Sequence, residues 1–249
     1  MLPPDQAALL AGAAFAAGVL NAIAGGGSFL TFPALVFCGV PPIAANATSA
    51  LAVSPGYLGS TLGFRAELGT MPRRQLWREG LIASAGGVAG ALLLLVTPGR
   101  LFAGLVPWLL LFATAMFALG PWLLKRLAQG QDLARWRTPG LLLVAVYGGY
   151  FNGGLGILLM ALYVLCGEAD LQRVNALKNL NSLVLSWLSV AAFVVAGVIA
   201  WAPGLLMMAA ATLGGFAGAR LARRLPAVWV RRLVIATGLA MTALFFARS

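Results

Sequence analysis

Long uncharged apolar runs dominate the chain, and short polar segments separate them. Leu81–Thr97 and Leu101–Leu124 are typical, and each is long enough for a helix to cross the roughly 30 Å hydrocarbon core of a bilayer. Runs of this kind predict transmembrane helices at 44–64, 80–97, 101–124, 174–199, 204–222 and 227–247. The pattern therefore predicts an all-α polytopic membrane protein.

Four shorter apolar pieces form two pairs, each split by glycines. Residues 7–24 and 27–40 flank the first break, and residues 140–151 and 155–167 flank the second. A 13-residue helix is only about 20 Å long, so the shortest pieces do not cross a bilayer upright. Each pair is interpreted as a glycine-broken helical hairpin, either re-entrant or made of two tilted short spans.

The chain repeats itself at a displacement of 128 residues. Gly86–Leu93 (GGVAGALL) matches Gly214–Leu221 (GGFAGARL). In the same order, Gly25-Gly26 matches Gly153-Gly154, Cys38-Gly39 matches Cys166-Gly167 and, after one inserted residue, Asn46 matches Asn175. These matches predict two repeats within one membrane domain, 1–128 and 129–249, each a broken hairpin followed by three transmembrane helices.

Each repeat crosses the membrane an odd number of times, so the two repeats are predicted to have inverted topology. The basic residues give an independent argument, because cytoplasmic loops are enriched in Lys and Arg. With this topology, fourteen of the 17 basic residues fall on one side, Arg100 and Arg248 fall on the other, and Lys178 lies within a span. The charge distribution therefore predicts that both termini lie outside the cytoplasm.

Composition excludes several classes of protein. With 61% apolar and 9% charged residues, the chain does not have the polar surface of a soluble enzyme or a nucleic-acid-binding domain, despite its net charge of +11. The sequence has no His, the commonest metal ligand, and only two Cys. It also has no Walker-type phosphate loop. We therefore expect no enzyme activity, metal, cofactor or direct use of ATP.

The two glycine breaks are the first candidate binding site. The residues of interest are Asn21, Gly25, Gly26, Gly27 and Ser28 in the first repeat, and Asn152, Gly153, Gly154 and Gly156 in the second. Helices that begin at such breaks direct free N–H groups and a positive dipole end at the gap, which suits a small anion. The alternative is that these glycines only permit close helix packing.

Polar residues open the next long segment of each repeat and extend this site. They are Asn46, Thr48 and Ser49 in the first repeat, and Asn175, Lys178, Asn179 and Ser182 in the second. The second set shares one helical face, and a cation inside a span indicates a functional site. Two structural alternatives stay open: Lys178 snorkels to the interface, or it pairs with Glu168 or Asp170.

Several blocks together resemble the TauE/SafE sulfite-exporter (anion permease) family. They are Ala24–Leu30 (AGGGSFL) followed by Pro33, Ala45–Ser49, Asn175–Asn179, Ala196–Trp201 and Gly214–Leu221. The resemblance covers nearly the whole chain and implies movement of sulfite, sulfoacetate or related organic anions across the inner membrane. Two features depart from it. The second break is not an uninterrupted glycine run, and no acidic residue precedes Trp201.

The sequence hypothesis is thus a secondary transporter, most simply a sulfite exporter that works by alternating access. The first alternative is a channel for anions or small solutes with the same lining residues. A structural role as an assembly partner is another alternative. The expected partners are a small anion and the bilayer, but no nucleic acid; a coupling proton and a homodimer stay open.

Overall fold

The computed structural model describes residues 2–23, 26–127, 133–221 and 227–248, and within these the chain is helical without strands. Its helices, in order, are α1 (Pro4–Ile23), α2 (Ser28–Phe37), α3 (Pro42–Gly63), α4 (Arg65–Gly69), α5 (Arg73–Val96), α6 (Gly99–Leu127), the 3₁₀ turn η1 (Ala134–Trp136), α7 (Arg137–Tyr150), α8 (Leu155–Leu165), α9 (Leu171–Val195), α10 (Trp201–Leu221) and α11 (Ala227–Arg248). The predicted all-α class is therefore confirmed.

Both predicted helix breaks are present. The first separates α1 from α2, and the second separates α7 from α8. The short helices α2 and α8 also end alike, since Gly39 and Gly167 follow them with φ of +83° and +85°. The next amide then bonds back to the last turn, from Val40 to Leu35 and from Glu168 to Tyr163, each at 3.0 Å. This Schellman cap explains the repeated Cys-Gly pair, because glycine adopts the left-handed conformation without strain.

Three helices within the described residues are long and apolar enough to span a membrane: Arg73–Val96, Gly99–Gly120 and Leu171–Val195. The other predicted spans are helical but do not meet the same criterion in the described residues. α3, for example, is 22 residues long, yet it contains buried Asn46, Thr48, Ser49 and Ser54. Its polar side chains face protein rather than lipid, so its low hydropathy follows from where it lies in the fold.

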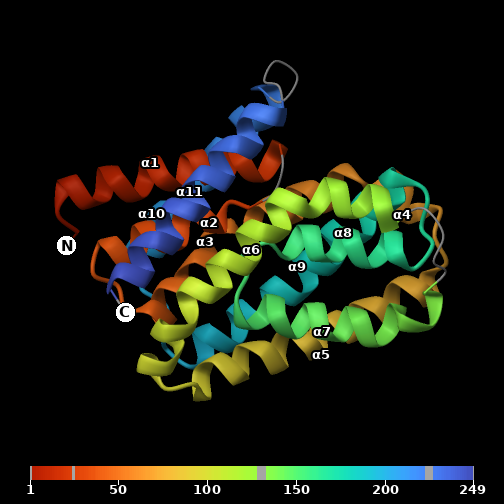
Figure 1. Cartoon of the computed structure of the whole chain (residues 1–249), viewed down its shortest axis with the longest axis horizontal. Helices are drawn as coiled ribbons and strands as arrows, with labels where there is room; N and C mark the ends of the chain where they lie inside the picture. The colour runs from red at the N-terminus through yellow and green to blue at the C-terminus, as the bar shows by residue number, and fades with distance from the viewer. Residues whose placement is uncertain (1, 24–25, 128–132, 222–226, 249) are drawn as a thin grey trace.

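The helices pack in two groups that exchange one member each. α10 packs along α1 and α3, and with α2 these form what we call the first bundle. α5 packs along α7 and α9, and with α8 these form the second bundle, at the bottom right of Figure 1. α6 and α11 pack on each other and on the bundles, and α3 and α9 meet between them. Thus α5, from the first half of the chain, packs in the second bundle, and α10, from the second half, packs in the first bundle.

The largest boundary difference from the prediction is at the start of α5. The long segment predicted at 80–97 begins at Arg73, and a short helix, α4, occupies the preceding loop. The charged residues at the start of α5 are compatible with a helix whose first turns lie outside the hydrocarbon. Because α5 begins at Arg73, Glu79 lies inside the helix, where it is 1% exposed. Both chain ends lie at the same end of the molecule, opposite α4 (Figure 1).

Candidate functional site

A cavity of about 330 Å³ lies between the two bundles. Its walls come from α1, α2, α3 and α10 of the first bundle and from α8 and α9 of the second. The predicted site residues that line it are Asn21, Gly26, Ser28, Asn152, Gly154, Gly156, Lys178, Asn179 and Ser182. The structure therefore brings both glycine breaks and the polar face of α9 to one place.

Lys178 is the cation of this cavity. It lies about two turns into α9, and its Nζ donates to Asn175 Oδ1 at 3.1 Å. The described lining residues include no other cation and no carboxylate. Neither carboxylate named as an alternative partner pairs with it, because Glu168 lies 3.7 Å from Arg173 and Asp170 caps α9 by accepting from Gln172 N at 2.8 Å.

The start of α8 lies next to this lysine. A Cβ built on Gly156 would be 3.6 Å from Lys178 Cδ, so the lysine side chain passes directly over the first turn of α8. Gly154, which precedes α8, has a φ of +74° and turns the chain into the helix. An ammonium and a helix N-terminus thus lie together at one wall, and both favour negative charge.

Neutral polar groups complete the cavity. Asn21 Oδ1 accepts from Gly27 N at 2.7 Å, which holds the start of α2 against α1. Tyr57 on α3 donates to Asn152 Oδ1 at 3.2 Å across the two bundles. Ser182 is 1% exposed, and its Oγ has no hydrogen-bond partner in the described part of the chain. The cavity therefore offers an ammonium, hydroxyls and amides to a ligand.

Other predicted site residues lie outside the lining and make packing bonds. Asn46 Nδ2 donates to Tyr150 O at 3.0 Å, and Thr48 Oγ1 accepts from Ala200 N at 3.0 Å. The second bond satisfies a backbone amide at the start of α10. Both bonds join residues from different halves of the chain, so these side chains connect helices in this structure.

The remaining predicted residues are also placed by packing bonds. Ser49 Oγ lies 2.6 Å from Thr31 Oγ1. Gly153 O accepts from Tyr147 at 2.7 Å, and Gly27 is the partner of Asn21 described above. Gly25 lies outside the described residues. These bonds fix the backbone at the two breaks.

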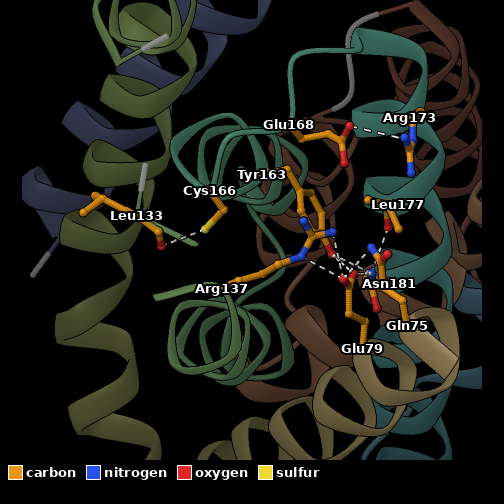
Figure 2. Close-up of polar contacts among 10 residues, drawn as sticks. All are labelled: Gln75, Glu79, Leu133, Arg137, Tyr163, Cys166, Glu168, Arg173, Leu177 and Asn181. Atoms are coloured by element: carbon orange, nitrogen blue, oxygen red, sulfur yellow. Dashed lines mark hydrogen bonds and ion pairs between the residues drawn. The ribbon is translucent and has the colours of Figure 1, made fainter. Parts of the chain in front are cut away.

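A second polar cluster, around Glu79, was not predicted (Figure 2). Glu79 Oε1 lies 2.8 Å from both Nε and Nη2 of Arg137 and accepts from Gln75 at 3.1 Å. Glu79 Oε2 accepts from Tyr163 at 2.9 Å and from Asn181 at 3.4 Å. The carboxylate thereby joins α5 to α7, α8 and α9, away from the cavity lining.

A helical chain with membrane-length apolar helices and a cavity that gathers polar groups at two helix breaks has the construction of a membrane transporter. The comparisons with known proteins agree. Residues 10–245 match the family described as Sulfite exporter TauE/SafE, and the chain belongs to that family.

Three curated relatives cover nearly the whole chain. A probable membrane transporter protein of Haemophilus influenzae is 29% identical over 96% of this chain and 94% of its own length. The probable membrane transporter protein ORF9 of Sinorhizobium sp is 31% identical over 92% and 88%, and the probable membrane transporter protein YfcA of Escherichia coli K12 is 27% identical over 98% and 90%. No solved structure matches the chain. The family and these names indicate a membrane transporter rather than an enzyme.

Proposed function

We propose that the protein is a secondary transporter that exports sulfite, or a related small sulfur-containing or organic anion, across the inner membrane. The observation that carries this proposal is the charge of the cavity, whose described lining has Lys178 and no carboxylate. A membrane interior strengthens the interaction of such a charge with a ligand, because bulk water does not screen it. The family description supports the same class of substrate.

In this proposal the anion binds between the Lys178 ammonium and the first turn of α8. The residues we propose for the site are the predicted residues that line the cavity, together with Tyr57. Asn46, Thr48, Ser49, Gly153 and Asn175 then act by holding the helices and the lysine in place.

We propose that transport proceeds by alternating access, and the exchange of α5 and α10 supports this mechanism. The pairs α5–α7 and α10–α1 correspond under the repeat, as do α5–α9 and α10–α3. This reciprocity supports inverted repeats, with the two bundles rocking about the cavity between them. An inside-negative potential drives anion export without a coupled ion, and a coupling proton is the alternative. In either case both termini face outward in this topology.

Flux through proteoliposomes containing the purified protein tests the proposal. We expect saturable uptake of radiolabelled sulfite, with acceleration by unlabelled sulfite on the opposite side and competition by thiosulfate or sulfoacetate. Protein-free liposomes are the control. Conductance that rises linearly with concentration, without counterflow, would instead identify an anion channel. Absence of flux for every anion in the panel would contradict the proposal.

Tyr57→Phe is expected to raise the half-saturating anion concentration roughly three- to tenfold, because the Asn152 amide in the cavity wall loses the hydroxyl that orients it. The matched control is Tyr147→Phe, which also removes a tyrosine hydroxyl that bonds near the second break, to Gly153 O, but one that does not line the cavity. Initial rates over a range of sulfite concentrations measure both. Equal effects of the two substitutions would remove Tyr57 from the proposed site.

A further inference from the structure

The Glu79 cluster holds together the two helices that form the anion side of the cavity. Tyr163, which donates to Glu79, lies in the last turn of α8, and the first turn of α8 lines the cavity. Asn181, which donates to both Glu79 and Tyr163, lies three residues after Lys178 on α9. One carboxylate thus bonds to both of the helices that form this side of the cavity.

The fold does not require charge at this place. The repeat displacement equates Glu79 with Met207, Tyr163 with Leu35 and, after the inserted residue, Asn181 with Ala52. These three apolar residues are between 0% and 1% exposed, so the first bundle packs the equivalent region without a polar network. Because a buried ion pair stabilises a fold less well than apolar packing in many cases, stability alone does not explain the cluster.

What the cluster provides is directional bonding. Apolar contacts tolerate small sliding movements, whereas a carboxylate with an arginine, a tyrosine and an amide as partners has a narrow geometry. Asn181 Nδ2 also donates to Leu177 O at 3.0 Å and to the Tyr163 hydroxyl at 2.7 Å. The register of α9 against α8 is therefore fixed by bonds rather than by shape alone.

That register determines the position of the ammonium. The Lys178 side chain passes 3.6 Å from the Cβ position of Gly156, at the first turn of α8. A slip of α9 along α8 would move Nζ relative to the free amides of that turn, and small displacements of a charged group weaken the binding of a ligand held between both.

We propose that Glu79 is a positioning residue: it sets the register of α8 and α9 and thereby the geometry between the Lys178 ammonium and the start of α8. The inference rests on the proposed function, since it names what holds that site in shape. Arg137 pairs with this carboxylate and ties it to α7.

The test is Glu79→Gln in the purified full-length protein, read by sulfite flux and by amide hydrogen exchange. We expect the half-saturating concentration to rise about tenfold while the maximal rate per folded molecule changes less than about twofold. Exchange in α8 and α9 rises, and exchange in α1 and α2 does not. A purely structural role would lower the amount of folded protein and leave the half-saturating concentration unchanged.

Two further variants keep the test decisive. Tyr163→Phe removes the hydrogen bond between α8 and Glu79 but leaves Arg137 paired, so it takes the place of Glu79→Gln if that variant does not fold. We expect Tyr163→Phe to raise the half-saturating sulfite concentration roughly three- to fivefold. Glu168→Gln is the matched control, because Glu168 also pairs with an arginine, Arg173 of α9, but belongs neither to the Glu79 cluster nor to the cavity lining. This control should change neither the half-saturating concentration nor the maximal rate of sulfite flux.

Unchanged half-saturation in both cluster variants would overturn the inference, as would unchanged exchange in α8 and α9. Failure of the proposed function looks different, because the wild-type protein would then show no saturable anion flux at all. Amide exchange needs no substrate, so in that case it still decides whether Glu79 fixes the register of the two helices.

Discussion

Replacement of Lys178 by alanine is expected to lower sulfite flux at low concentration about a hundredfold, because a hydrogen bond to a charged group contributes about 1.5–3 kcal/mol. Lys178 is the one cation among the described lining residues, and the cavity has no second charge to compensate for its loss. The variant is measured in proteoliposomes after its folding is verified by gel filtration.

Two variants isolate the charge. Lys178→Arg should retain more flux than Lys178→Ala, because it keeps a cation over the first turn of α8. Arg173→Ala, on the same helix, is the matched control and should change flux less than about twofold, since exposed ion pairs contribute little. If Lys178→Ala transports like the wild type, the lysine is structural and the anion binds elsewhere.

The second large effect is a loss of stability, which we expect from a substitution at the crossing of α1 and α10. A Cβ on Gly18 would overlap the carbonyl oxygen of Ala211 and lie 2.7 Å from Gly215 N. Since both neighbours are backbone atoms, the helices must separate to accept even alanine. We expect Gly18→Ala to destabilise the protein by about 1–3 kcal/mol, which is the usual range for overpacking. Thermal unfolding in detergent measures it.

Gly12 on the same helix provides the control. A Cβ there would meet no atom within 4 Å, so Gly12→Ala adds a methyl group without a clash. Alanine also favours helix over glycine, so the expected change in stability is neutral or slightly positive. Equal losses at both positions would mean that helix α1 responds to any substitution, and that the close approach to α10 is not what Gly18 provides.

The repeated glycine motif could be interpreted only in part from the sequence. The match between Gly86–Leu93 and Gly214–Leu221 indicated a duplication but not the purpose of its glycines. In the structure a Cβ on Gly90 would overlap Val146 O, and one on Gly214 would overlap Phe15 O. The motif is where α5 and α10 cross the opposite half, and spacing along a chain does not disclose such a partner.

Lys178 and the two breaks were predictable because each violates a strong expectation: a charge inside an apolar run, or glycines in the middle of a helix. Asn46, Thr48 and Ser49 gave the same signal as Asn179 and Ser182, yet they bond to helices instead of lining the cavity. A polar residue in a span marks a need for a hydrogen bond, and the sequence does not tell whether protein or ligand supplies it.

Glu79 and Tyr57 were missed for different reasons. Glu79 follows an arginine-rich stretch, so it was assigned to a loop, although the helical pattern extends back through it to Arg73. Its partners on other helices come from α7, α8 and α9, which are distant in sequence, so the residues around Glu79 give no indication of them. Tyr57 bonds to Asn152, 95 residues away in the sequence, so no local pattern indicates that contact.

The exchange of helices has a consequence for biogenesis. α5 is synthesised before α7, α8 and α9 exist, so Glu79 is at first without Arg137 and Tyr163 as partners. Until the ribosome delivers the second half, this carboxylate has only Gln75 of its own helix beside it. The second bundle is complete once α9 has been made, whereas the first bundle is completed later, when α10 has been made.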